Sequence, residues 1–158
     1  VLFSFIYSCG LRIGEVCRLK IADIDSDRMQ VRVVKSKGPS DRYVPLSRYA
    51  LQGLRKYVGS AKPAVYLFNG KKKGTPLGTS SVQQSFRWAV NRARIHKDVS
   101  VHSLRHTYAT HLLEEGVDIV TIKELLGHAS IDTTMMYLHV AKVHRRNAHS
   151  PLDTLYLV

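Results

Sequence analysis

The sequence predicts a mainly α-helical domain with one small antiparallel β-sheet, which is an α+β fold. Most of the 158 residues lie in stretches whose apolar side chains recur at helical spacing. Only the region 29–46 contains an alternating, β-branched run followed by a short turn and a second strand-like run, which indicates a hairpin. The chain has no internal repeat and no low-complexity stretch. Its length is sufficient for a single domain to bury its own core.

Two helices are predicted at the start of the chain. Residues 1–8 are almost entirely apolar, which indicates a helix of the core, and Gly10 breaks it. Helical spacing resumes over 13–19, where apolar residues three apart share one face. Residues 23–27 that follow are rich in turn-forming residues.

The small sheet is expected from the next region. Residues 29–34 (MQVRVV) alternate and are rich in β-branched side chains, and 42–46 (RYVPL) form a second strand. Residues 36–40 (SKGPS) form the turn between the two strands. This turn contains Lys37, so the hairpin is expected to have a basic tip. Residues 66–68 (YLF) predict a short third strand.

Helical spacing dominates the rest of the chain, apart from a surface loop rich in Gly and Lys at 69–79. Asp118 is expected to cap one of these helices and Gly127 to end it. Ser130 or Asp132 is expected to cap the last helix. The predicted helices after the hairpin cover 47–58, 81–95, 101–115, 119–126 and the segment from 130–132 to Tyr137.

The charge of the chain points to a polyanionic partner. There are 24 Lys and Arg against 12 Asp and Glu, a formal net charge of +12. The basic residues cluster, which suits several separate contacts to phosphates along a duplex. The clusters are Lys35, Lys37 and Arg42, then Lys71, Lys72 and Lys73, then Arg145 and Arg146.

The two cysteines and the apolar N-terminal residues indicate the cellular location of the protein. Cys9 and Cys17 stand eight residues apart in apolar surroundings, which is neither a disulfide framework nor a zinc pattern. Reduced, buried thiols are the rule in cytoplasmic proteins, so we expect a cytoplasmic location. Residues 1–8 lack the basic region of a signal peptide and are too short to span a bilayer, so no membrane contact is predicted.

Five residues combine into a pattern that suits attack on a phosphodiester. Tyr137 follows His128 by nine residues in LGHASIDTTMMYLHV, His102 and Arg105 lie in HSLRH, and Arg12 lies in CGLRIGEV. A phenolate is a nucleophile, guanidiniums bind the phosphate, and imidazoles move the protons.

These motifs give the chain a resemblance to the tyrosine recombinases, the phage integrase family. They occur in the family's order from GLRIGEV to YLHV: Arg, Lys in a hairpin, His-x-x-Arg, Gly-His and Tyr. The resemblance implies the tyrosine recombinase catalytic-domain fold. It also implies a site-specific recombinase or integrase that cleaves and rejoins DNA strands through a 3′-phosphotyrosyl intermediate, without metal, ATP or any other cofactor.

The resemblance also assigns a role to each motif residue. Tyr137 is the nucleophile. Arg12 and Arg105 bind the non-bridging oxygens, where charge grows in the transition state. His102 helps to deprotonate Tyr137, and His128 hydrogen-bonds a non-bridging oxygen.

Other candidates surround these motifs. Glu15 has the right helical spacing to steady Arg12. Lys37 is the expected general acid for the departing 5′ oxygen, with Lys35 as the alternative in the same hairpin. Tyr108 is the alternative nucleophile. The candidates for contacts to DNA are Lys35, Arg42, Lys71, Lys72 and Lys73.

The resemblance further implies partners and domain organisation. In the family a small helical DNA-clamping domain precedes the catalytic one, so we expect residues 1–158 to be one catalytic domain truncated at its N-terminus. Four protomers act on two DNA duplexes and exchange C-terminal segments. The chain alone is then a monomer or a swapped dimer, and the intact protein is associated with the nucleoid.

Three other interpretations stay open at this point. A non-catalytic helix-turn-helix protein would explain 118–140 and the charge. A type IB topoisomerase would share the tyrosine chemistry. His102, His106 and His111 would form a metal site if they converged, although HSLRH lacks an accompanying carboxylate.

Overall fold

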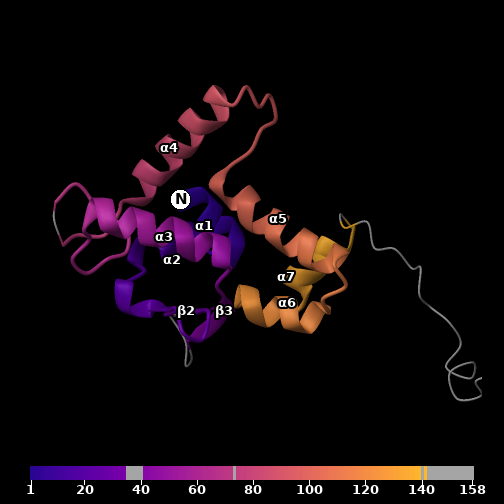
Figure 1. Ribbon diagram of the computed structural model, residues 1–158. Coiled ribbons are helices and arrows are strands. Elements are labelled where there is room, and N and C mark those ends of the chain that lie inside the picture. Colours follow the sequence, from indigo (N-terminus) through magenta and orange to yellow (C-terminus); the bar gives the residue numbers. More distant parts are fainter. Residues whose placement is uncertain (35–40, 73, 140, 142–158) are drawn as a thin grey trace, which may run out of the picture.

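The computed structural model describes residues 1–34, 41–72, 74–139 and 141 (Figure 1). It has the predicted α+β architecture of many helices around one small sheet. The helices are α1 (Leu2–Cys9), α2 (Ile13–Arg18), α3 (Arg48–Ala61), α4 (Thr79–Arg92), α5 (Val101–Glu114), α6 (Ile119–Leu126) and α7 (Asp132–Met135), with the 3₁₀ turns η1 (Ile21–Asp23) and η2 (Met136–His139). The strands are β1 (Ile24–Asp25), β2 (Gln30–Val33) and β3 (Arg42–Pro45).

The sheet is antiparallel with the order β1-β2-β3. The predicted hairpin is therefore confirmed, with Val31 opposite Val44 and both side chains buried. The predicted strand at 66–68 is wrong, since Tyr66 makes only an isolated bridge to Lys20. The strand that completes the sheet beside the hairpin is β1. It has only two residues, which is too short to give an alternating pattern in the sequence.

The main core lies between α1, α2, α3, α4 and the inner face of the sheet. The N-terminal apolar run forms α1 as predicted, with Phe5 and Ile6 fully buried. Val16 of α2 and Val31 of β2 pack into the same cluster. None of the helices in the described ranges is long and apolar enough to cross a membrane.

A second, smaller core joins α5, α6 and η2 at one end of the molecule, where Figure 1 shows these elements grouped around α7. Its buried members are Tyr108, Ala109, Leu113, Ile122, Leu126 and Tyr137. The end of α1 meets this core because Gly10 has a left-handed backbone, with φ of 58°, and no side chain. A Cβ at Gly10 would collide with the ring of Tyr108.

The predicted start and end of α6 are confirmed. Asp118 accepts hydrogen bonds from the backbone N–H groups of Val120 and Thr121 at 3.0 and 2.9 Å. Gly127 closes the helix in the left-handed conformation with φ of 64°. These two signals place His128 directly beyond a helix C-terminus.

The segment that carries Tyr137 differs from the expected single α-helix. Only Asp132–Met135 is α-helical, and Tyr137 lies in the 3₁₀ turn that follows. Ile131 occupies the N-cap position, so the predicted cap by Ser130 or Asp132 is wrong. The Ser130 hydroxyl instead accepts from the Asp132 backbone N–H and donates to its carboxylate.

Candidate active site

Arg12 stands at the N-cap of α2, where the expected contact with Glu15 is present. The Arg12 backbone N–H donates to the Glu15 carboxylate at 2.7 Å, and Nη1 donates to it at 3.1 Å. The guanidinium also donates to the carbonyl oxygens of Leu126 and Gly127 at 3.2 and 3.3 Å. Its side chain is 40% exposed, so this cation is fixed in direction and still open to a ligand.

Arg105, on α5, is the most deeply placed cation of the site and is only 1% exposed. It donates to the carbonyl oxygens of Gly10 and Leu126, both at 2.6 Å. Burial, followed by the positive charge of Arg12, lowers the pKa of Arg105 to about 10, so the guanidinium remains charged at neutral pH. Because Arg12 and Arg105 share the Leu126 carbonyl, their two guanidiniums converge beside the end of α6.

Arg42, expected to contact DNA, has each of its three side-chain nitrogens hydrogen-bonded within the protein. Its Nη1 and Nη2 donate to the two oxygens of Glu15 at 2.8 Å each, and Nε donates to the Leu125 carbonyl at 2.7 Å. The side chain is 14% exposed. This placement favours a supporting role, in which Arg42 ties β3 to α2 and α6.

Glu15 is therefore the carboxylate that joins the arginines. Its Oε2 also lies 4.0 Å from Nη1 of Arg105. Burial alone would raise the pKa of Glu15. The hydrogen bonds and charge of Arg42, the Arg12 backbone N–H and the charge of Arg105 outweigh burial and hold that pKa below its usual value. A single ionised carboxylate thus fixes the arginine cluster in place.

We expect Glu15→Gln to lower the free energy of unfolding by about 3 kcal/mol, because it leaves the nearly buried Arg42 and Arg105 with no opposing charge. The ionised form of Glu15 stabilises the fold above its unfolded pKa of about 4.3, and this contribution is lost as pH falls through the lower folded value. The difference in the free energy of unfolding between wild type and Glu15→Gln should therefore be largest near neutral pH and should decrease in acid.

Urea unfolding at several pH values measures this difference. Glu124→Gln is the matched control, since Glu124 is exposed on α6 and should change stability by less than about 0.5 kcal/mol. Equal unfolding midpoints for Glu15→Gln and wild type at neutral pH would contradict the role given to Glu15.

His128 lies beside the arginines and is held by a residue of α7. Its Nδ1 is 2.8 Å from the Thr134 hydroxyl, and Thr134 is fully buried. Burial, followed by the charges of Arg105, Arg12 and Arg42, lowers the pKa of His128 to about 4, so the ring is neutral at pH 7. Thr134 was missed in the sequence, because six residues separate it from His128 and no local motif links them.

Tyr137 is 3% exposed and packs between two imidazoles. Its ring stacks on His128 at 6.4 Å with an interplanar angle of 12°, and it contacts His106 at 5.4 Å. Burial raises the pKa of Tyr137, while the charges of Arg105 and Arg12 favour the phenolate. Among the described residues no hydrogen bond to its hydroxyl occurs.

His106 is the second site residue that sequence reasoning did not assign. Its ring lies 4.5 Å from that of His102, one helical turn away, so His106 stands between His102 and Tyr137. Burial and the charge of Arg105 lower its pKa, and burial, His106 and Arg105 lower the pKa of His102. The four-residue spacing on α5 was the available signal, since it puts both rings on one face.

The histidines of α5 do not converge on a metal site. His111 lies near the far end of α5, where its Nδ1 is 2.8 Å from the hydroxyl of Tyr7. Within the described ranges no group of three or more His, Cys, Asp or Glu side chains is arranged to hold a metal ion.

Tyr108, the alternative nucleophile, is also buried in the second core, and among the described residues it makes no ring contact with His102, His106 or His128. It is 8% exposed and packs edge-on against Tyr7. Burial, followed by the neighbouring Cys9, raises the pKa of Tyr108 to about 12. Tyr137 thus contacts two imidazoles, whereas Tyr108 packs against Tyr7.

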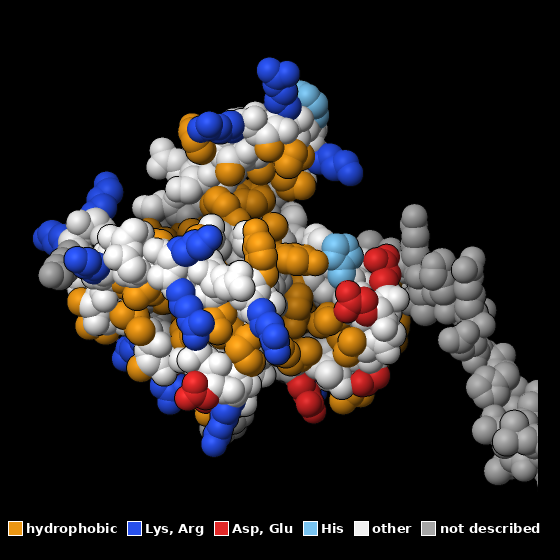
Figure 2. Space-filling model, viewed as in Figure 1, with side chains coloured by type: hydrophobic (Ala, Val, Ile, Leu, Met, Phe, Trp, Pro, Cys, Tyr) orange, Lys and Arg blue, Asp and Glu red, His pale blue; other side chains and the backbone are white. Residues whose placement is uncertain are grey.

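Lys71 and Lys72, which were predicted to contact DNA, are separate from this site. Lys71 and Lys72 are exposed on the segment between α3 and α4, at the opposite end of Figure 1 from α6 and α7. Figure 2 shows Lys and Arg side chains at that end and also over the top and the middle of the same face. The predicted residues Lys35, Lys37 and Lys73 lie outside the described residues, as do Arg145 and Arg146.

Comparison with known proteins identifies the family of this chain. The model of the Phage integrase family matches residues 1–144. The putative integrase/recombinase y4qK of Sinorhizobium fredii is 46% identical over 149 residues, which cover 94% of this chain and 48% of that protein. A tyrosine recombinase of Thermosipho africanus is 45% identical, with 92% of this chain and 50% of that protein covered.

Solved structures give the same relationship. The crystal structure of XerA recombinase superposes with a TM-score of 0.78 at 32% identity, covering 99% of this chain and 56% of that one. XerH recombinase, captured with its palindromic difH substrate after cleavage, also gives 0.78, at 28% identity over 89% of this chain and 42% of that one. The chain spans about half the length of the curated relatives it matches. It belongs to the phage integrase family of tyrosine recombinases.

Proposed function

We propose that the chain is the catalytic domain of a site-specific DNA recombinase, which cleaves and rejoins strands through a 3′-phosphotyrosyl intermediate. The observation that carries this proposal is the packing of Tyr137 against His128 and His106, beside the converging guanidiniums of Arg12 and Arg105. A buried phenol among imidazoles and fixed cations is suited to attack on an anionic phosphate.

In the cleavage step the Tyr137 oxygen forms a bond to phosphorus, and the bond from phosphorus to the 5′ oxygen breaks. The arginines stabilise the charge that grows on the non-bridging oxygens, and Arg12 is the more accessible of the two. Because burial raises the pKa of Tyr137, its phenol is protonated at neutral pH, and this proton has to be transferred to a base when the oxygen attacks. His102 and His106 have lowered pKa values, so both are neutral at pH 7 and able to accept it.

Lys37 is assigned to protonate the departing 5′ oxygen. Rejoining is the reverse reaction, with the 5′-hydroxyl of a partner strand as the nucleophile. The phosphotyrosyl bond conserves the energy of the phosphodiester, so the cycle needs no ATP. The partner is double-stranded DNA, and we assign the whole protein to an assembly of four protomers on two duplexes, associated with the nucleoid.

Capture of a nicked duplex library tests this function. Cleavage next to a nick releases a short fragment that cannot return, so the enzyme should stay covalently attached to the duplexes that it recognises. Sequencing the captured duplexes should yield one preferred site. A non-catalytic helix-turn-helix protein would capture nothing, and a type IB topoisomerase would capture DNA without a preferred site and relax supercoiled plasmid alone.

Thr134→Val should reduce the cleavage rate by up to about tenfold. To donate a hydrogen bond from Nε2 to a non-bridging oxygen, His128 must keep Nδ1 unprotonated, so the Thr134 hydroxyl has to donate to Nδ1. Loss of one such bond is worth about 1 kcal/mol. Single-turnover cleavage measures the effect, and Thr134→Ser should restore the rate. Equal rates for Val and Ser variants would remove Thr134 from the mechanism.

Cleavage should be unchanged by EDTA. Two guanidiniums already supply the positive charge that a metal ion would bring to a phosphoryl transfer, and the covalent step needs no activated water. The check is cleavage of a nicked duplex before and after exhaustive chelation. Loss of activity on chelation with recovery on adding zinc or manganese would show a metal requirement.

A further inference from the structure

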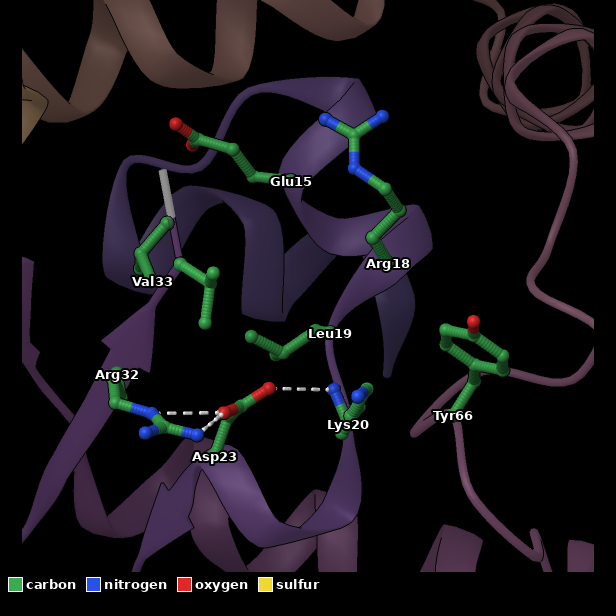
Figure 3. Close-up of a pocket in the computed structure, with 9 residues that line it drawn as sticks. Glu15, Arg18, Leu19, Lys20, Asp23, Arg32, Val33 and Tyr66 are labelled. Carbon is green, nitrogen blue, oxygen red and sulfur yellow. Dashed lines mark hydrogen bonds and ion pairs between the residues drawn. The ribbon is translucent and has the colours of Figure 1, made fainter. Parts of the chain in front are cut away.

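A cavity of about 310 Å³ lies next to the arginine cluster, between α2, β2 and Tyr66 (Figure 3). Glu15 and Arg18 line it at one end, while Lys20 and Tyr66 line its other side. Because Glu15 belongs to both, this cavity adjoins the proposed phosphate site. None of the roles assigned so far uses it.

The charges around this cavity do not cancel. Asp23 is neutralised by Arg32, whose Nε and Nη2 donate to it at 3.1 and 2.8 Å. The Glu15 carboxylate is bound by Arg12 and Arg42. No acidic side chain of the described residues forms an ion pair with Arg18 or Lys20, so these two leave the cavity with an excess of positive charge.

Arg18 is directed toward the active-site end of α2. Its Nη2 lies 3.4 Å from where a Cβ at Gly14 would stand, so the guanidinium folds back over the first turn of the helix. Gly14 is two residues after Arg12, which is about 3 Å along the helix axis. The guanidinium of the exposed Arg18 thus lies over the first turn of α2, the helix whose N-cap is Arg12.

We propose that this cavity is a second phosphate site, which holds a backbone phosphate of the DNA beside the scissile one, with Arg18 as its main donor and Lys20 as its second cation. Successive phosphates of one strand are spaced by about 3.4 Å along the duplex axis, so a strand anchored at Arg12 presents further phosphates to the adjoining cavity. A planar guanidinium suits two phosphate oxygens at once. This inference rests on the proposed function, because it places the scissile phosphate at Arg12.

The first test compares Arg18→Gln with Arg28→Gln, which removes the same charge from an exposed arginine that does not line the cavity. Binding to the captured duplex is measured by fluorescence anisotropy over a range of salt concentrations. Arg18→Gln should weaken binding by about tenfold at low salt and reduce the salt slope by about one, whereas Arg28→Gln should do neither. The same losses in both variants would overturn the proposal.

The second test replaces single phosphates near the cleavage site by neutral methylphosphonates. In wild type, one position beside the scissile phosphate should weaken binding by about tenfold, and at that position Arg18→Gln should show no further loss. Equal losses in both proteins at every position would overturn the proposal. The proposal would also be overturned if free phosphate or a mononucleotide bound the cavity with the same affinity as the duplex.

Covalent capture at saturating DNA distinguishes failure of the proposed recombinase function from failure of the second phosphate site. Wild type and Arg18→Gln should both form the adduct with Tyr137. If neither forms it, the proposed function fails. If both form it and the methylphosphonate pattern is identical, only the second phosphate site fails.

Discussion

Tyr137→Phe should abolish covalent capture of DNA and leave duplex binding close to that of wild type. Only one hydroxyl is lost, and no described residue hydrogen-bonds it, so the ring should keep its place between His128 and His106. Loss of a covalent nucleophile removes activity by a factor on the order of 10⁶. Stability should also be retained, because the buried ring is unchanged.

A denaturing gel of a nicked duplex shows the covalent adduct directly, and anisotropy measures binding. Tyr108→Phe is the matched control, since Tyr108 is also a buried tyrosine of the second core and should keep the adduct. An adduct that persists in Tyr137→Phe would move the nucleophile elsewhere, and loss of the adduct in Tyr108→Phe alone would identify Tyr108.

Lys37→Ala should slow cleavage by about 10²–10⁴-fold, the usual contribution of a positioned proton donor. Without a donor, the 5′ oxygen has to leave as an alkoxide. A substrate with sulfur at the 5′ bridging position releases a thiolate, which needs no proton. This substrate should therefore restore cleavage to Lys37→Ala, as measured under single-turnover conditions.

Two further variants sharpen that experiment. Sulfur should do little for Arg105→Ala, whose defect lies in the charge on the non-bridging oxygens. Rescue of Lys35→Ala in place of Lys37→Ala would shift the general acid by two residues. Rescue of neither variant would place the acid outside the hairpin.

The sequence by itself was sufficient for features that depend on neighbouring residues. Asp118 and Gly127 mark the ends of α6 because a side-chain cap and a left-handed glycine act within one helical turn. The pairing of β2 with β3 was expected from an alternating, β-branched run followed by turn-forming residues and a second strand-like run. The motifs with Arg12, Arg105, His128 and Tyr137 were enough to indicate the family, which the comparisons confirm.

Only the tertiary structure decided which side chains meet across the chain. Arg42 lies in a basic stretch, yet it binds Glu15, 27 residues away, and the Leu125 carbonyl, 83 residues away. His106 and Thr134 join the site because α5 and α7 pack against η2, and β1 becomes a strand because β2 pairs with it. The physical reason is the same in each case. Helix caps and alternation are encoded in adjacent residues, whereas ion pairs, ring contacts and short strands depend on which distant elements the core brings together.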